Sequence, residues 1–406
     1  MDKNKRLTVW LPVIIAASIA LGIFIGNHYL SISQGKKRSY SSGNKINAIL
    51  DIIDEQYVDT VSMSKLVEST IPKIFSELDP HSVYIPAEDA SVVNEELEGS
   101  FSGIGVSFNM QTDTILVISV ISGGPAEKAG LLPFDRIISI NDSIFSGKKK
   151  NQGEIMKTLR GAKNSTVKLG VQRGNSPELL YFDVTRGDVP VNSVDVSYEA
   201  AKGIGYIKVS KFARNTYNEF ITAIAKLKQA GCTSFVIDLR GNTGGYMDAA
   251  INMINEFMPE GRLIVYTEGK SFPRSDVYAN GTGTCKDAPI VVLTDEISAS
   301  ASEIFSGAIQ DNDRGTIIGR RTYGKGLVQT QMSLSDGSEM RLTIARYYTP
   351  SGRCIQKKYE MGNTDAYDQD IYNRYMHGGF DSADSIKMDD SLKYQTVGGR
   401  TVYSGG

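Results

Sequence analysis

Histidine is scarce in this chain. Only His28, His81 and His377 occur among 406 residues, and none lies in a pattern that suits catalysis. His28 follows an apolar N-terminal stretch, and His81 lies in a proline turn, where a lone histidine is more often a hydrogen-bonded structural residue. A serine nucleophile in this protein therefore needs a base other than histidine. A lysine kept neutral by burial can be that base.

Cysteine is also scarce, and no sign of charge dominates. Cys232, Cys285 and Cys354 are too few and too scattered for a disulfide framework or a zinc site, and their odd number leaves at least one free thiol. The formal net charge of −2 gives no electrostatic case for nucleic acid. A hydrophobic content of 41% is typical of globular domains. A chain of 406 residues is long enough for two or three such domains. The sequence indicates no metal ion and no cofactor.

An uncharged stretch near the N-terminus predicts a membrane anchor. It runs from Leu7 to Ile25, which suits one helical crossing of about 20 apolar residues. A short basic segment precedes it, which favours a cytoplasmic N-terminus. No small-residue cleavage pattern and no lipidation cysteine follow it, so we expect an uncleaved single-pass anchor. Residues 1–30 are then the cytoplasmic tip and the anchor, in contact with the inner (cytoplasmic) membrane through 7–30. The rest is exported to the periplasm or cell exterior.

A linker and a helical region are predicted over residues 31–87. Apolar residues between Ile46 and Tyr57 recur at intervals of three and four, which gives one apolar helix face. A second helix is expected from Ser64 to Leu78. The turn Asp79-Pro80-His81-Ser82 follows, because proline prevents the helix from continuing.

The pattern changes to short strands bounded by glycines over residues 88–187. A lone Gly-Ile-Gly is weak evidence, and a generic small β-domain is the alternative. The ordered set of strands, glycine turns and one helix nevertheless resembles a PDZ domain. The resemblance implies a loop whose backbone N–H groups bind a peptide's terminal carboxylate, while the peptide adds as an extra strand. That loop consists of Gly103, Ile104, Gly105 and Val106, and Val106 and Phe108 flank the groove.

Strands and helices alternate over residues 188–406, which favours an α/β core with largely parallel strands. Sites in such folds gather at the carboxyl ends of strands. One glycine-rich turn, Asp238 to Gly245, follows a buried strand at such an end. It lacks the Lys-Ser/Thr pair of a phosphate-binding P-loop. Its free N–H groups suit an oxyanion instead.

A second turn, Ser298 to Glu303, opens a helix with three serines, and Lys325 follows between two glycines. Ser300 and Glu303 have the spacing of a capping box, and any of the three serines can be a plain helix-start residue. Lys325 opens a strand in which alternate residues share a face, so Gln329 points the same way. Gln329 can therefore accept a hydrogen bond from the lysine amine.

These motifs resemble the carboxyl-terminal processing peptidases, also called tail-specific proteases. The resemblance covers about residues 44–358 and rests on the serine turn, on Tyr323 to Gln329, and on Leu342 to Arg353. It implies a multidomain α/β (α+β) protein with a crotonase-like protease core. It also implies a serine endopeptidase that cleaves exported proteins near their C-termini, with the PDZ domain binding apolar C-termini of protein or peptide substrates. Either a homo-oligomer or an adaptor protein is compatible with this architecture.

The resemblance also assigns roles to individual residues. Ser300 is the nucleophile, Lys325 the general base and Gln329 the orienting third member. The N–H groups of Ala301 and of either Gly244 or Gly245 form the oxyanion hole. A catalytically inactive PDZ scaffold is the alternative function, and an acyl-CoA enzyme is a second one. The acidic stretch 359–391 is predicted to be an inserted, solvated loop.

Overall fold

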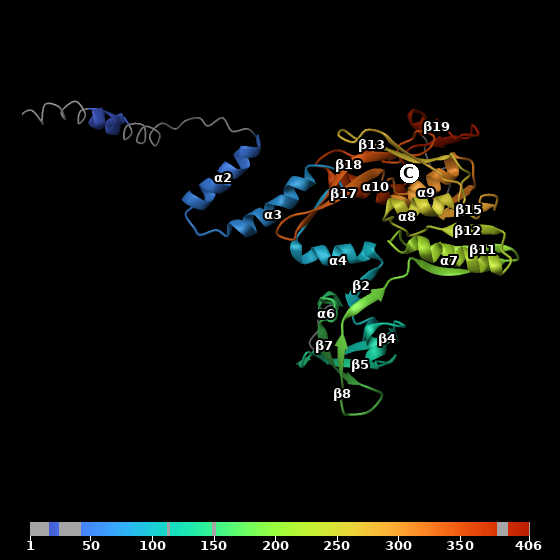
Figure 1. The fold of residues 1–406 in the computed structure, drawn as a ribbon, viewed down its shortest axis with the longest axis horizontal. Helices are drawn as coiled ribbons and strands as arrows, with labels where there is room; N and C mark the ends of the chain where they lie inside the picture. The colour runs from blue at the N-terminus through green and yellow to red at the C-terminus, as the bar shows by residue number, and fades with distance from the viewer. Residues whose placement is uncertain (1–15, 24–41, 112–113, 148–151, 380–388, 406) are drawn as a thin grey trace, which may run out of the picture. The chain divides into compact units, whose positions relative to one another are not determined.

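The computed structural model describes residues 16–23, 42–111, 114–147, 152–379 and 389–405 (Figure 1). The chain divides into two units, residues 1–69 and 70–406. In the first unit, residues 16–23 are helical and helix α2 spans Ser42–Gln56. Helix α3, Met63–Ser76, crosses the boundary between the units. Within the described ranges no helix is long and apolar enough to span a membrane. Most of the anchor predicted over residues 7–25 lies outside those ranges.

A small β-domain follows helix α4 (Ala87–Glu98). Its main sheet has the strand order β3-β4-β5-β7-β8, with all neighbours antiparallel and β6 paired to β5, while β2 pairs with β9. Fully buried aliphatic side chains from several strands, such as Val117, Ile137 and Val167, form its core. Its strands are β2 Ser100–Gly103, β3 Val106–Gln111, β4 Thr114–Val120, β5 Arg136–Ile140, β6 Ser143–Ile144, β7 Thr166–Gln172, β8 Leu180–Thr185 and β9 Gly187–Pro190, and its helices are α5 Pro125–Ala129 and α6 Gln152–Leu159.

Strand β3 lies at the edge of this sheet, so its outer side can pair with another strand. Val106, Phe108 and Met110 alternate along it and pack, partly buried, on the domain core. The loop before the strand turns at Gly105, which has φ 76°. Ile104 is 2% exposed and belongs to the core. The side chain of Ile104 therefore stabilises the domain and is not offered to a ligand.

The larger domain contains a sheet of strand order β10-β11-β12-β15-β16. The last four strands are parallel, and β10 is antiparallel to β11. Phe257, just after α8, meets Phe220, Phe235 and Phe305 edge-to-face at 6.2–6.5 Å, which joins the helices to the sheet. The elements are β10 Val194–Ala201, β11 Ile204–Val209, α7 Thr216–Gln229, β12 Ser234–Asp238, α8 Met247–Asn255, β15 Ile290–Thr294, α9 Ala301–Asp311 and β16 Thr316–Gly319.

A second sheet carries the strand that follows Lys325. Its order is β1-β18-β13-β14, and β17 pairs antiparallel with β18. Because β1 pairs with β18, the turn Asp79-Pro80-His81-Ser82 is brought to the same sheet as β17. The strands are β1 Val83–Ile85, β13 Leu263–Glu268, β14 Ser275–Tyr278, β17 Leu327–Ser333 and β18 Glu339–Tyr348.

The acidic stretch 359–391 differs from the solvated loop predicted for it. It contains helix α10, Thr364–Met376, and Tyr367 on this helix is only 3% exposed. The acidic composition did not reveal that this helix has one buried face. On that face Tyr367 contacts His81, and Arg374 donates to the Thr322 carbonyl. Residues 380–388 lie outside the described ranges. The chain continues through η2 Asp390–Leu392, β19 Lys393–Gln395 and β20 Thr401–Tyr403.

Candidate active site

Ser300 lies where the chain passes from β15 into helix α9. Its backbone has φ 55° and ψ −112°, a region that residues other than glycine seldom adopt. Such strain at a sharp strand-to-helix turn is typical of a nucleophile whose hydroxyl is presented to a cleft. The other two serines have structural partners. Ser298 donates to the Leu239 carbonyl at 2.8 Å and Ser302 to the Asn242 carbonyl at 2.9 Å.

Lys325 is held close to Gln329. Its Nζ donates to Gln329 Oε1 at 3.2 Å. The Gln329 Nε2 donates to the carbonyl of His81, which turns the amide oxygen toward the lysine. Burial lowers the pKa of Lys325, and the nearby Arg341 cation lowers it further. Both effects disfavour the charged ammonium, which is the condition for a lysine that acts as a base.

Glu303 connects the serine turn to the lysine loop, which we define as residues 320–326. Its side chain is fully buried, and Oε2 accepts the N–H groups of Ser300 and Lys325, both at 2.8 Å. Oε1 accepts the N–H of Gly324 and the hydroxyl of Thr322, both at 2.7 Å. Burial raises the pKa of Glu303, and these four hydrogen bonds oppose that shift.

Tyr347 ties the same two residues together through their carbonyls. Its side chain is buried, and its Oη contacts the carbonyl oxygens of Ser300, at 3.1 Å, and of Lys325. The backbone N–H groups of both residues meet Glu303. Ser300 and Lys325 are thus fixed to each other through main-chain atoms on both sides, across 25 positions of sequence.

The glycine-rich turn after β12 abuts the serine turn. A Cβ placed on Gly244, which has φ 103°, would lie 2.8 Å from Ser300 Cβ and 3.1 Å from Ala301 N. Only glycine allows this approach. The Gly244 N–H already donates to Asn242 Oδ1 at 2.9 Å, and the Asn242 amide is oriented by the Val209 carbonyl. Of the two glycines predicted as alternative oxyanion donors, Gly244 therefore has its N–H engaged within the turn.

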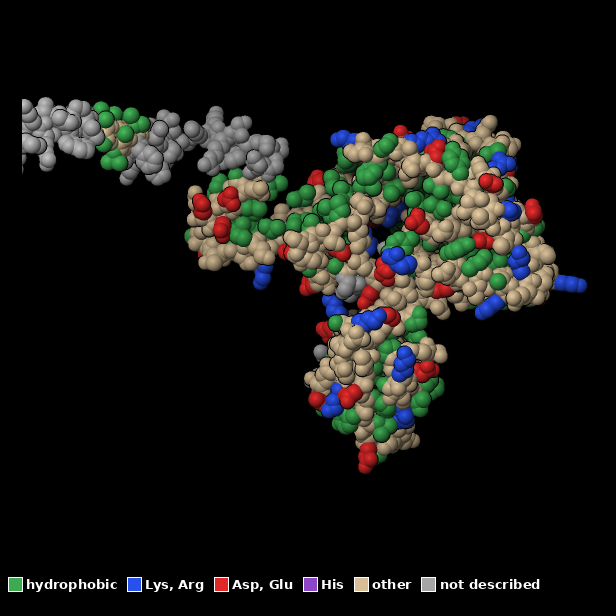
Figure 2. Space-filling view, viewed as in Figure 1, with side chains coloured by type: hydrophobic (Ala, Val, Ile, Leu, Met, Phe, Trp, Pro, Cys, Tyr) green, Lys and Arg blue, Asp and Glu red, His purple; other side chains and the backbone are tan. Residues whose placement is uncertain are grey.

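A cleft of about 570 Å³ contains Ser300, Lys325 and Gln329. Figure 2 shows the surface hollowed between the β17–β18 hairpin and α8, elements that supply its walls. Its lining combines apolar side chains, which suit an extended chain with hydrophobic residues, with polar ones from β17 and β18. The apolar lining residues are Val93, Met247, Ile304, Leu327 and Val328, and the polar ones beyond the three named include Gln331 and Arg341.

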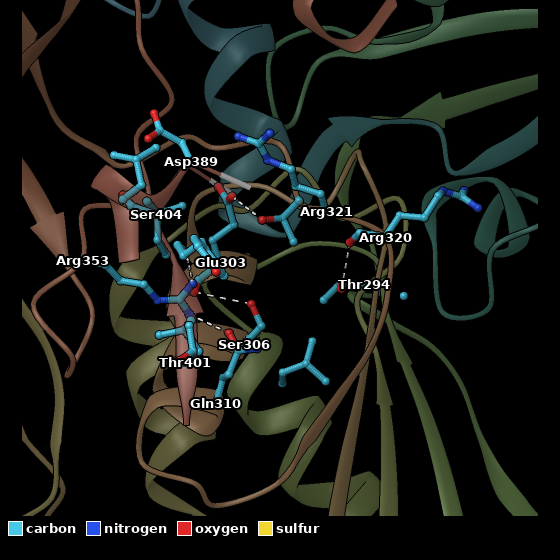
Figure 3. A pocket seen from close by; sticks show the side chains of 18 residues that line it. Thr294, Glu303, Ser306, Gln310, Arg320, Arg321, Arg353, Asp389, Thr401 and Ser404 are labelled. Carbon is cyan, nitrogen blue, oxygen red and sulfur yellow. Dashed lines mark hydrogen bonds between the residues drawn. The ribbon is translucent and has the colours of Figure 1, made fainter. Parts of the chain in front are cut away.

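A second cavity of about 440 Å³ lies beside α9 (Figure 3). Glu303 contributes to its wall, but Ser300 and Lys325 do not. The labelled arginines there are engaged. Arg353 pairs with Asp311 at 2.9 Å and donates to Gln310, and Arg320 pairs with Glu296. This cavity therefore borders the residue that links the serine and the lysine without holding either of them.

His81 is close to the candidate site but is a weaker base than an ordinary histidine. Burial and the charge of Lys325 lower its pKa from 6.5 to about 4. Its Nε2 lies 2.9 Å from Tyr367 Oη, and its carbonyl orients Gln329. His377 is exposed at the end of α10, and His28 lies outside the described residues.

Sequence reasoning missed Glu303, Tyr347, Tyr367 and the Asp79–Ser82 turn as parts of this site. The signal for Glu303 was present, because the capping-box spacing marked it, but its other partners are 19–22 positions away. Tyr347 and the Asp79–Ser82 turn contact residues that are far away in the sequence, so no short sequence pattern marks them.

Comparisons with known proteins agree with this organisation. A model described as peptidase family S41 matches residues 203–365, and one described as PDZ domain matches 102–195. Carboxy-terminal processing protease CtpB from Bacillus subtilis (strain 168) is 35% identical over 318 residues, which cover 78% of this chain and 66% of that protein, just under two thirds. A probable CtpA-like serine protease from Staphylococcus aureus (strain N315) is 33% identical over 365 residues, covering 88% of this chain and 72% of that protein.

Among solved structures, the photosystem II D1 C-terminal processing protease is 28% identical, with a TM-score of 0.44, and the match covers 78% of this chain and 91% of that one. The family model and these relatives define the class, a serine-type peptidase. The chain belongs to peptidase family S41. The family predicted from the sequence motifs is confirmed, and so is the multidomain α/β fold with a PDZ domain.

Proposed function

We propose that this protein is a serine endopeptidase that cleaves exported proteins near their carboxyl ends, with Ser300 as nucleophile and Lys325 as general base. The observation that carries the proposal is the double link between the two residues. Their N–H groups share one oxygen of Glu303, and their carbonyls share Tyr347 Oη. A lysine with a lowered pKa is thereby fixed to a serine in a strained turn.

The reaction follows from these positions. Neutral Lys325 takes the hydroxyl proton of Ser300 as Oγ attacks the peptide carbonyl, and the N–H groups of Ala301 and Gly245 bind the oxyanion that forms. The lysinium then donates its proton to the departing amine. A water molecule, deprotonated by Lys325, releases the acyl group from Ser300. Gln329 accepts a hydrogen bond from the lysine amine and orients it.

Two substitutions test the catalytic assignment. We expect Ser300→Ala and Lys325→Ala each to reduce peptide cleavage by at least about a thousandfold, because nucleophile and base act as a unit. Circular dichroism and thermal unfolding show whether both variants fold. Normal cleavage by Ser300→Ala ends the proposal. A folded wild-type protein without any cleavage supports the inactive scaffold instead.

The PDZ domain is proposed to bind the substrate's C-terminus. The edge strand β3 supports this, because a peptide can add to its outer side while Val106 and Phe108 contact apolar side chains. The turn at Gly105 is the proposed carboxylate site. A peptide with a free C-terminus should be cleaved with a higher kcat/KM than its amidated form. Equal values would reject terminal recognition.

Membrane attachment is a further part of the proposal. The uncharged run of residues 7–25, preceded by basic residues, supports an uncleaved anchor in the cytoplasmic membrane with the remaining domains exported. The full chain should then stay in the membrane fraction through alkaline carbonate washing, and a protein starting at residue 31 should not. Equal release of both proteins would count against the anchor.

A further inference from the structure

The lysine loop has no regular secondary structure between β16 and β17, so its shape depends on contacts from outside. Its N–H groups at Gly324 and Lys325 meet Glu303 on the side of α9. Its carbonyls at Thr322 and Tyr323 meet a different element. Both accept from Arg374 of helix α10, at 2.6 and 3.4 Å.

Arg374 is itself held in place. Its side chain is 10% exposed, and Nη2 pairs with Asp370 one turn earlier at 2.9 Å. Asp370 also pairs with Lys357 at 3.1 Å. The Lys357 ammonium lies over the rings of Tyr323 and Tyr367, 4.4 and 4.0 Å from their centroids. Lys357 and Arg374 are largely buried, whereas Asp370 is 35% exposed. Removing the two cations from water is costly, so we expect the cluster to fix geometry more than it adds stability.

Tyr367 of α10 reaches the other group that orients the lysine. Its Oη accepts from Gln356 Nε2 at 3.2 Å and forms a hydrogen bond with Nε2 of His81, 2.9 Å away. The two rings meet edge-on at 5.2 Å. The His81 carbonyl accepts the Gln329 amide proton, and Gln329 accepts from Lys325. A chain of contacts therefore runs from α10 to the lysine amine.

Gln356 closes the connection on the loop side. Its Oε1 accepts the N–H of Gly326, the residue after Lys325, at 2.9 Å, and its amide donates to Tyr367. Arg374 contacts the loop two and three residues before Lys325. Residues before and after Lys325 in the sequence are thus held by contacts that lead to α10.

We propose that α10 is a positioning element for catalysis, in which Arg374 and Tyr367 keep Lys325 within reach of Ser300 by fixing the lysine loop and the Gln329 amide. Neither residue is among those that line the cleft, so both act through Lys325 and neither touches substrate. This inference rests on the proposed function of Lys325 as the base. Undocking of α10 releases the loop and lowers the rate while Ser300 stays intact.

The test compares Arg374→Ala, Arg374→Lys and Tyr367→Phe with Tyr372→Ala, a control at a residue of the same helix that is 61% exposed. Kinetic constants are expressed per folded protein, measured by circular dichroism and thermal unfolding, so loss of folded protein does not count. A small displacement of a catalytic group costs up to about a hundredfold. We expect Arg374→Ala and Tyr367→Phe to lower kcat about tenfold or more with KM unchanged. Arg374→Lys should fall between, because an ammonium lacks the guanidinium fork that meets two carbonyls.

Wild-type kcat in both Arg374→Ala and Tyr367→Phe overturns the inference. If Arg374→Ala does not fold, Tyr367→Phe decides, because it removes one hydroxyl and keeps the ring. A fall in kcat for Tyr372→Ala equal to that of Arg374→Ala also overturns it, since the effect would then not be specific to the buried face. Lys325→Ala separates the two claims. Full activity in that variant removes the proposed function itself, whereas an inactive Lys325→Ala beside unaffected α10 variants removes only the role of α10.

Discussion

The buried carboxylate of Glu303 accepts four hydrogen bonds, two at each oxygen. Ser300 and Lys325 share Oε2, so the positions of the proposed nucleophile and base are set by the same atom. A carboxylate accepts at both oxygens, whereas a glutamine side chain accepts at one and donates at the other. The charge, rather than the size, of this side chain is what lets it bind both segments.

Glu303→Gln is therefore expected to disturb the site with little change in volume. The amide nitrogen faces N–H groups that it cannot accept, which leaves buried donors unpaired at a cost of about 1–3 kcal/mol each. We expect a lower unfolding temperature and a kcat reduced about tenfold or more. Glu296→Gln is the matched control, because its pair with Arg320 near the surface contributes less than about 1 kcal/mol. Equal effects of the two substitutions would refute this role.

Arg341 acts on Lys325 through charge. A nearby cation disfavours the protonated amine and so lowers the pKa of Lys325, after the larger effect of burial. The rising limb of the pH profile of kcat/KM reports the loss of that proton. Arg341→Gln removes the cation, so the pKa of Lys325 rises and the limb moves to higher pH. Arg346→Gln, at an exposed position of the same strand, should leave it in place. A limb at the same pH in both variants would contradict this electrostatic account.

At the scale of elements, the site forms where the turn after β12 packs against the turn after β15. The parallel strands β12 and β15 pair directly, so their carboxyl ends lie together. A Cβ on Gly244 would meet Ser300 at 2.8 Å, and Asn242 holds the turn by hydrogen bonds to Gly244 N and the Val209 carbonyl. The glycine is required here by contact as well as by its φ of 103°.

Alanine substitutions at two glycines of this turn distinguish the effect of steric contact from the effect of backbone strain. Gly244→Ala places a methyl group against Ser300 and in front of Ala301 N, so we expect kcat to fall about a hundredfold, as for loss of an oxyanion donor. Gly241 has φ 73° with open space around it. Gly241→Ala should reduce stability by about 1 kcal/mol and leave kcat unchanged. Steady-state kinetics and thermal unfolding measure both, and a normal kcat in Gly244→Ala would refute the crowding argument.

The sequence predicted the parts of the site that short spacing encodes. The contact between Lys325 and Gln329 was predicted, although Lys325 lies two residues before β17 and a register shift between Val328 and Gln329 interrupts the alternation on which the prediction rested. The turns after β12 and β15 meet because parallel strands place them at one edge. The Asp79–Ser82 turn, Tyr347 and α10 reach the site through tertiary contacts, which no local period reveals. The acidic composition of α10 even indicated the opposite, since charge density is a poor guide to a helix with one buried face.

At the scale of the whole molecule, the proposed recognition and the proposed chemistry belong to separate domains. The PDZ domain has its own core and its own edge strand. The α/β core has a separate core and holds Ser300 and Lys325. We therefore expect the binding of a C-terminus to change how often a substrate is presented, and the serine turn to set how fast it is cut.

The substitution Phe108→Ala tests whether peptide binding by the PDZ domain is separate from catalysis in the α/β core. Phe108→Ala removes an apolar wall of the proposed groove, so kcat/KM for a peptide with a free C-terminus should fall about tenfold, while kcat at saturation stays unchanged. The advantage over the amidated peptide should disappear. Tyr181→Ala, at an exposed position of β8, is the control and should have no effect. A lower kcat with unchanged kcat/KM ratios between the two peptides would show that the groove is not where the terminus binds.

The most direct measurement of the central claim is to label the folded wild-type protein with a fluorophosphonate and locate the modified residue by peptide mass spectrometry. The account predicts one modified serine, Ser300, with labelling that stops cleavage and is lost in Lys325→Ala. Ser298 and Ser302 should stay unmodified, because their hydroxyls are buried and bound to carbonyls. Modification at any other serine with loss of activity, or full activity after Ser300 is labelled, would contradict it.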